Sequence, residues 1–95
     1  MNELITRIAI EYGIDVDKAI KVAENESGLN PNAINDKNNY PAGSRDRGLY
    51  QWNDYWNPQI TDKCAFDPEC ATREFCKAIK AGRAKEWVGA KGIFY

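Results

Sequence analysis

Apolar residues at helical spacing mark two helices at the start of the chain. The first stripe consists of Leu4, Ile5, Ile8, Ala9 and Tyr12 and predicts a helix over residues 3–12 that stops at Gly13. The second stripe consists of Val16, Ala19, Ile20 and Ala23 and predicts a helix that Asp15 caps. This second helix is expected to end near Ser27 and Gly28.

A third helix is expected in the C-terminal part of the chain. Asp67 followed by Pro68 is a strong start signal, because the carboxylate caps the first turn and proline fits there. The buried stripe consists of Ala71, Phe75, Ala78 and Ile79, and Gly82 is the stop. A last short helical piece is expected at residues 84–88.

The middle of the chain carries turn residues instead of a periodic pattern. Residues 29–43 contain five asparagines, two prolines and Gly43, which predicts a loop, and residues 48–56 are expected to form a turn that enters a short helix. A calcium loop at residues 36–46 is rejected, because Tyr40 and Pro41 stand where an EF-hand needs a ligand and a glycine. The sequence predicts a mainly α fold (α+β with little strand) in a single domain over residues 1–95.

Composition and charge exclude several classes of function. Thirteen basic and fourteen acidic residues give a net charge of −1, which is no footprint for nucleic acid. No apolar run approaches the ~18 residues of a membrane span, so no membrane partner is expected. Histidine is absent, which excludes Ser-His or Cys-His nucleophile pairs and His-ligated zinc. No metal or cofactor is implied, and we expect a monomer.

The three cysteines, Cys64, Cys70 and Cys76, form no CxxC pair and do not make a complete disulfide framework. We expect small, partly buried thiols. Residues 70 and 76 lie about 9 Å apart along the predicted helix, on faces roughly 120° apart, so they should not pair. Any bridge that forms must use Cys64.

Two carboxylates are candidates for acid–base chemistry. Glu26 falls on the margin of the apolar face of the second helix, where desolvation would raise its pKa, as a general acid near neutrality requires. Asp46 stands between Arg45 and Arg47 and is expected to stay ionised. One protonated and one ionised carboxyl group is the arrangement of glycoside hydrolysis. The alternative is an exposed glutamate in a frayed last turn and an aspartate in a solvated turn.

Two segments carry a family resemblance. Residues 26–35, Glu-Ser-Gly-Leu-Asn-Pro-Asn-Ala-Ile-Asn, resemble the catalytic Glu-Ser segment shared by chicken-type lysozymes and Slt-type lytic transglycosylases. Residues 44–53 are similar to the lysozyme stretch Ser-x-Asp-x-Gly-(Ile/Leu)-x-Gln-x-Asn. Residues 86–88 are similar, more weakly, to the lysozyme segment Ala-Trp-Val. The order of the two main segments matches the family, with extra length expected at residues 40–42.

The resemblance implies a role for each matching residue. Glu26 would be the general acid, Asp46 the carboxylate that stabilises or captures the intermediate, and Trp87 the apolar wall beside the acid. The remaining matches are residues expected to hydrogen-bond Asp46 or the sugar, namely Gln51, Asn53, Asn35 and Ser44. Apart from the resemblance, four aromatics within residues 50–56 suit stacking on sugars or filling a thin core: Tyr50, Trp52, Tyr55 and Trp56.

These matches lead us to expect a muramidase that cuts β-1,4 bonds between N-acetylmuramic acid and N-acetylglucosamine in peptidoglycan, with chitooligosaccharides as a further possible substrate. Slt-type transglycosylases usually have alanine in place of Asp46 and a later Ala-Tyr-Asn motif, which this chain lacks. Both departures favour hydrolysis. A lytic transglycosylase is the first alternative, a non-catalytic peptidoglycan- or chitin-binding module the second, and a helical interaction protein the third.

The N-terminal residues contain neither a basic segment nor an apolar one, so no secretory signal is expected. The chain would then be made in the cytoplasm and act on the cell wall. It would do so as a phage lysin, as a virion-associated hydrolase, or as a domain excised from a larger secreted protein.

Overall fold

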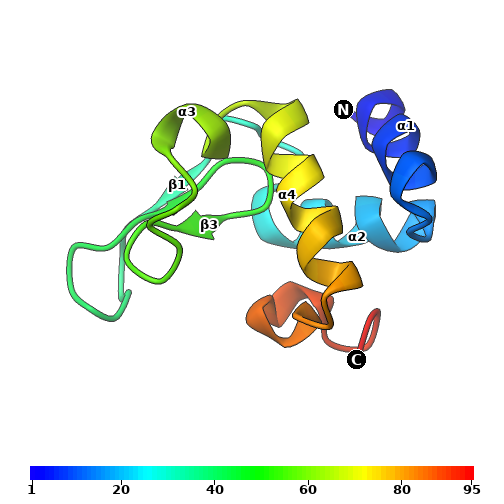
Figure 1. The fold of residues 1–95 in the computed structure, drawn as a ribbon. Coiled ribbons are helices and arrows are strands. Elements are labelled where there is room, and N and C mark those ends of the chain that lie inside the picture. The colour runs from blue at the N-terminus through cyan, green and yellow to red at the C-terminus, as the bar shows by residue number, and fades with distance from the viewer.

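The computed structural model describes all 95 residues and places four α-helices and two 3₁₀ turns beside a short sheet (Figure 1). The α-helices are α1 (Asn2–Tyr12), α2 (Val16–Ser27), α3 (Asp62–Ala65) and α4 (Pro68–Lys80). The strands are β1 (Ile34–Asn35), β2 (Asp46–Arg47) and β3 (Trp52–Asn53), and the C-terminal 3₁₀ turns are η1 (Ala84–Glu86) and η2 (Val88–Ala90). The predicted fold class, mainly α with little strand, is confirmed.

The three long helices begin and end at the residues that the sequence indicates. The Asp15 carboxylate accepts a hydrogen bond from the Lys18 N–H at 3.0 Å, and the Asp67 carboxylate accepts one from the Cys70 N–H at 2.8 Å. Gly13 ends α1 with φ of 70°, a left-handed conformation that glycine adopts without strain. The three predicted helices and the caps Asp15 and Asp67 are therefore confirmed, although α4 ends at Lys80, before the expected stop at Gly82.

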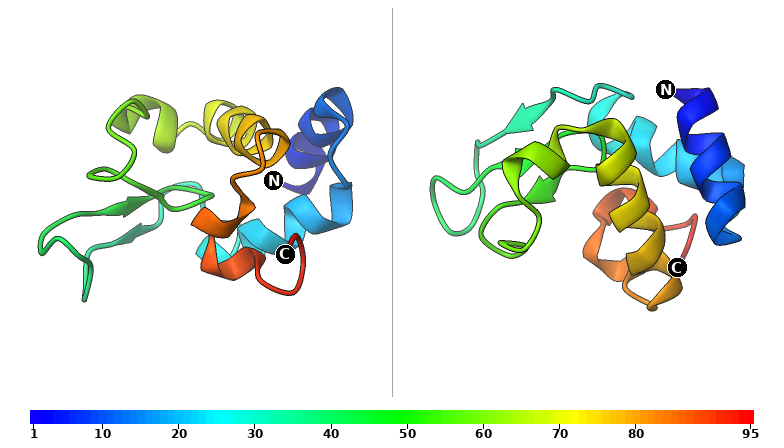
Figure 2. Two further views of the ribbon diagram at one scale, coloured as in Figure 1. Left: turned by 60° about the horizontal axis from the view of Figure 1, so that its bottom comes forward. Right: turned by 45° about the horizontal axis from the view of Figure 1, so that its top comes forward.

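The apolar core lies where α1, α2 and α4 meet the turn before β3. Helix α1 packs against both α2 and α4 (Figures 1 and 2). The Phe75 ring stacks on Tyr50 at 4.0 Å between centroids and meets the edge of Trp87 at 4.9 Å. These buried rings connect α4 with the C-terminal turns and with the turn that leads into β3.

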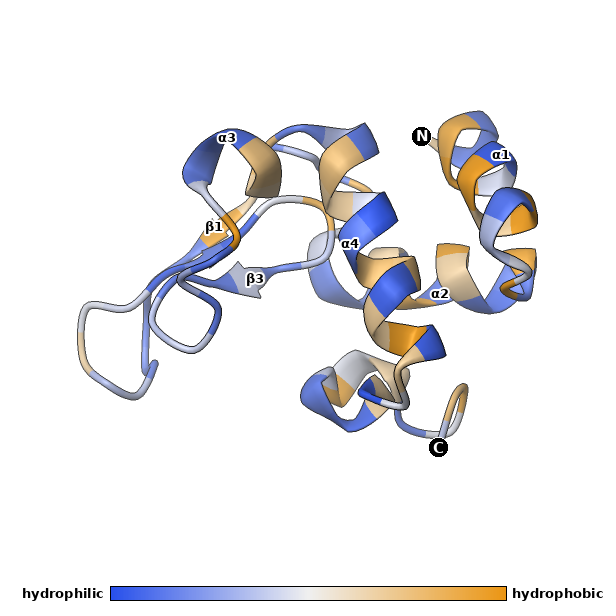
Figure 3. Ribbon diagram, in the orientation of Figure 1, coloured by the Kyte–Doolittle hydropathy of each residue, from blue (hydrophilic) through white to orange (hydrophobic).

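The sheet is small, antiparallel and hydrophilic. Its strand order is β1-β2-β3, and Asp46 on β2 stands opposite both Asn35 on β1 and Asn53 on β3. The sheet and its loops extend to one side of the helices (Figures 1 and 2) and are mostly polar (Figure 3). Gly48 lies against α3, where a Cβ atom would stand 1.8 Å from the Ala65 carbonyl oxygen, so only glycine fits.

Three expectations are corrected. Residues 48–56 form turns around β3 and contain no helix, because Trp52 and Asn53 pair with β2 instead. The short helix α3, capped by the Thr61 hydroxyl, was not predicted. Cys64 and Cys70 form a disulfide and are not thiols, while Cys76 is free and buried. No helix of the protein has the length and apolar character needed to cross a membrane.

Candidate active site

A cleft of about 650 Å³ lies between the helices and the sheet. Its walls come from the end of α2 (Glu26), from the loops and sheet (Asn39, Tyr40, Asp46, Gln51, Trp52, Asn53, Trp56, Asn57 and Gln59), and from the C-terminal segment (Arg83, Glu86, Trp87 and Val88). Both candidate carboxylates, Glu26 and Asp46, therefore line the same cleft although they come from different parts of the fold.

Glu26 lies in the last turn of α2 and is half-buried. Burial raises the pKa of its carboxyl group, the hydrogen bond from the Gly89 N–H opposes this rise, and the negative charge of Asp46 adds to it. The bond from Gly89 is 2.8 Å long and reaches Oε2. A Cβ atom at residue 89 would stand 2.3 Å from that oxygen, so glycine permits the contact. The environment keeps Glu26 protonated to higher pH than an ordinary glutamate.

The residue after Glu26 connects the two sequence segments. The Ser27 hydroxyl lies 2.8 Å from the Leu49 carbonyl oxygen and 3.1 Å from the Ala23 carbonyl oxygen, to either of which it can donate. The bond to Leu49 fastens the turn at residues 48–51 to the end of α2. The two segments that carry the resemblance therefore touch, which gives their joint occurrence a physical reason.

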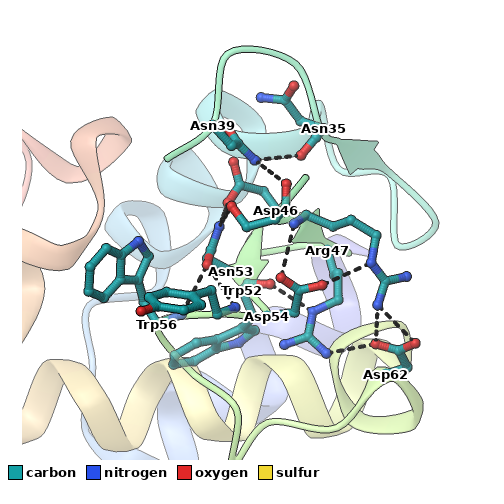
Figure 4. A network of polar contacts seen from close by, with 12 residues as sticks. Asn35, Asn39, Asp46, Arg47, Trp52, Asn53, Asp54, Trp56 and Asp62 are labelled. Carbon is teal, nitrogen blue, oxygen red and sulfur yellow. Dashed lines mark hydrogen bonds and ion pairs between the residues drawn. The ribbon is translucent and has the colours of Figure 1, made fainter. Parts of the chain in front are cut away.

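The Asp46 carboxylate on β2 is held by the side-chain amide of Asn53 (Figure 4). Asn53 Nδ2 donates to Asp46 Oδ1 at 3.0 Å and to the Ser44 hydroxyl oxygen at 3.2 Å. The Asn53 side-chain oxygen accepts hydrogen bonds from the N–H groups of Tyr55 and Trp56, which fixes the amide in one orientation. Asn53 thus contacts Asp46 directly, and Ser44 is connected to Asp46 through Asn53.

The flanking arginines do not contact Asp46, which corrects the reason given for its ionisation. Residues that alternate along a strand point to opposite faces, and both guanidinium groups point away from the cleft. The Arg45 guanidinium pairs with Asp54 and Asp62, and that of Arg47 pairs with Asp62 (Figure 4). These contacts hold the strand in place, and the Asp46 carboxylate bonds only the Asn53 amide.

The aromatic residues of the middle segment divide into two groups. Trp52 lines the cleft with Trp87, and their rings meet edge to face at 4.9 Å. Tyr50 is fully buried, its hydroxyl donates to the Ala19 carbonyl oxygen at 2.9 Å, and it does not line the cleft. Tyr50 therefore fills the core, which is the second of its two expected roles, and the prediction that it contacts a sugar is corrected. Trp56 is 60% exposed at the cleft and Tyr55 lies outside it.

Gln51 lines the cleft, whereas Asn35 does not. Gln51 Nε2 donates to the carbonyl oxygens of Gly48 and Ala33 at 3.0 and 3.3 Å, and its φ of 55° is left-handed. Strained backbone of this kind clusters at functional sites. The Asn35 carbonyl oxygen accepts a bond from Asn39 Nδ2, so Asn35 supports the loop behind the site.

Sequence reasoning missed six residues of the site. Five of them line the cleft, namely Asn39, Tyr40, Asn57, Gln59 and Arg83. The sixth, Gly89, contacts Glu26 from a segment remote in sequence. No spacing pattern signals them, because their positions depend on how the loops and C-terminal turns fold back. No group of three or more potential metal-ligating side chains is present.

A comparison with known protein families found a match. A family model described as a lysozyme-like domain matches residues 6–88. The chain has no significant match among curated proteins or among solved structures. The matched range includes both candidate carboxylates and every element from α2 to η1. The chain therefore belongs to the lysozyme-like domain family, whose activities are those of peptidoglycan glycosidases and lytic transglycosylases.

Proposed function

We propose that the protein is a muramidase, which hydrolyses the β-1,4 bond between N-acetylmuramic acid and N-acetylglucosamine. The observation that carries this proposal is the pair of carboxylates in one cleft. Burial raises the pKa of Glu26, and Asp46 is held by the Asn53 amide. A carboxyl group kept protonated beside a second carboxylate is the requirement for general acid catalysis of glycoside cleavage.

In the proposed reaction, Glu26 donates its proton to the glycosidic oxygen as the bond from that oxygen to C1 breaks. The Asp46 carboxylate stabilises the positive charge that develops on the ring. The Gly89 N–H then stabilises the Glu26 carboxylate left behind. Glu26 next takes a proton from water as the water oxygen bonds to C1, which restores the acid and leaves a reducing end.

A lytic transglycosylase is the second candidate, and the half-buried Glu26 supports it as well. The first step is the same, but the 6-hydroxyl of the muramic acid attacks C1 and Glu26 accepts its proton. The product is a 1,6-anhydro ring, and Asp46 has no part in the attack. We favour hydrolysis because Asp46 lines the cleft and is oriented by a fixed amide.

The test is digestion of purified cell walls followed by mass spectrometry of the soluble fragments. Reducing ends are expected from the wild-type protein, and anhydro ends, lighter by one water, would transfer the assignment to a transglycosylase. Glu26→Gln is the control, since it keeps the shape and removes the transferable proton. Wall binding by the wild-type protein without any release of fragments would instead identify a binding module.

The proposed substrate places the action of the protein at the bacterial cell wall. The proposed ligands of the cleft are the glycan strands of this wall. Chitooligosaccharides are proposed as well, because they also contain N-acetylglucosamine units. Comparing the two glycans in the same digestion assay tests this proposal. Cleavage of chitooligosaccharides alone would contradict it.

A further inference from the structure

Asp62, outside the cleft, connects the two arginines that flank Asp46. Its carboxylate accepts bonds from Arg45 Nη2 at 2.8 and 3.1 Å and from Arg47 Nη1 at 2.9 Å. Asp62 lies on α3, fifteen residues after Arg47 in sequence. One exposed aspartate is thus the shared partner of Arg47 on β2 and of Arg45, which directly precedes that strand.

Arg47 makes this contact unusual, because its side chain is 2% exposed. Its Nε donates to the Trp52 carbonyl oxygen at 3.0 Å, and Nη2 has no partner. Asp62 is the only acidic group that bonds Arg47. A buried charge deprived of its partner is strongly unfavourable, so the position of Asp62 determines how β2 can lie.

Asp46 occupies the opposite face of the same two-residue strand. Any shift of β2 must therefore move Asp46 relative to Asn53 and to the rest of the cleft. Arg45, directly before the strand, also donates to Asp54, from its backbone N–H at 3.0 Å and from Nε at 2.9 Å. The arginines and their carboxylate partners thus hold the strand on the face away from the cleft. Asp46 lies on the face toward the cleft.

Helix α3 is too short to hold Asp62 by itself, since a four-residue helix has little stability of its own. The Cys64–Cys70 disulfide joins it to the first turn of α4, and Ala65 is buried against Gly48. The position of Asp62 is therefore fixed to the helical part of the protein.

We infer that Asp62 is a positioning residue for Asp46, which it acts on through Arg45, Arg47 and strand β2. The inference rests on the proposed function for its kinetic consequence, but the geometry that it describes can be tested without any activity. Because Asp62 is outside the cleft, its loss should lower kcat on soluble glycan strands and leave KM close to the wild-type value. A misplaced reacting group costs roughly ten- to a hundredfold in rate.

The experiment compares Asp62→Asn, Asp62→Glu and the control Asp36→Asn, an exposed aspartate of the same lobe without a hydrogen-bonded partner. The side-chain amide signals of Asn53, followed by NMR, report its bond to Asp46. We expect Asp62→Asn to shift these signals and to lower kcat about tenfold. We expect Asp62→Glu to restore most of both, and Asp36→Asn to change neither.

Arg45→Gln is a second variant in case Asp62→Asn does not fold, because it leaves the Arg47–Asp62 pair intact, and it should shift the same signals. Unchanged Asn53 signals in a folded Asp62→Asn protein would overturn the inference, whatever the activity. Shifted signals in a protein whose wild type does not cleave cell walls would support the inference and contradict the proposed function.

Discussion

The helices and the sheet lobe, which consists of strands β1 to β3 with their loops, hold their carboxylates by different means. Glu26 ends a helix that is packed into the apolar core, and burial is the main cause of its raised pKa. Residues 30–47 contribute no side chain to that core, and their only buried members are Ser44 and Arg47. Asp46 is accordingly held by a hydrogen bond from the Asn53 amide. The comparison shows that the cleft lies where an apolar scaffold and a polar one meet, so each carboxylate has the surroundings that its proposed role needs.

The largest effect is expected from Glu26→Gln, which removes the proton supplied by the helical side. General acid catalysis contributes about 10²–10⁴-fold, so the rate of cell-wall lysis should fall by at least two decades. Lysis close to the wild-type rate would show that the helical side does not supply the acid.

The same variant has a consequence for stability. A raised pKa means that the folded protein holds the Glu26 proton more tightly than the unfolded chain does. The protonated side chain therefore adds to the free energy of unfolding at low pH, and this addition is lost as the pH rises through the folded pKa. Glu26→Gln should therefore raise Tm at pH 7. The difference should vanish below about pH 4, where a glutamate is protonated in both states. A Tm difference that does not depend on pH would contradict the raised pKa.

The next prediction compares how much a side chain of the helical core and one of the sheet lobe contribute to the free energy of unfolding. Phe75→Ala removes a ring that is fully buried between Tyr50 and Trp87, and such losses cost about 3–5 kcal/mol. Tyr55→Ala removes a ring of the sheet lobe that is 58% exposed, and should change the free energy of unfolding by about 0.5 kcal/mol or less. Urea unfolding followed by tryptophan fluorescence measures both. Equal losses would show that the sheet lobe has a core of its own.

Asp46→Asn should have an intermediate effect on the rate of lysis. It also tests the electrostatic coupling between Asp46 in the sheet lobe and Glu26 on α2. We expect a loss of about tenfold or more in the rate of lysis, because the variant removes the charge that stabilises the intermediate. The negative charge of Asp46 also raises the pKa of Glu26, so the alkaline limb of the pH–rate profile should move to lower pH. An unmoved limb would contradict electrostatic contact across the cleft. Asp36→Asn is the control for charge alone.

A smaller effect on activity is expected from the disulfide that joins α3 to α4. The double substitution Cys64→Ser with Cys70→Ser should lower the free energy of unfolding by about 2 kcal/mol, because the loop that the bridge closes is short. The rate of lysis should fall less than in Asp62→Asn, since Ala65 still anchors α3. Dithiothreitol should reproduce this change in the wild-type protein and have no effect on the double variant. A response of the double variant to the reductant would point to another cause.

The sequence determined the three long helices almost completely. The stripes of α1, α2 and α4 and the caps Asp15 and Asp67 are local signals, since a capping bond spans three residues and a stripe repeats within one helix. Glu26 could be found in the same way, because its place on the helical wheel follows from the pattern of its own helix. The motif at residues 44–53 located Asp46, although the reason given for its ionisation was wrong.

Only the tertiary structure decided what surrounds the two carboxylates. Gly89 reaches Glu26 across sixty-three residues, and Asp62 reaches Arg47 across fifteen. Arg45 and Arg47 stand beside Asp46 in sequence, yet the alternation of a strand turns them to the opposite face. Tyr50 has an aromatic side chain of the kind that stacks on sugars, but it is buried against Phe75 instead. Contacts of this kind depend on how separate segments pack, and no local pattern encodes them.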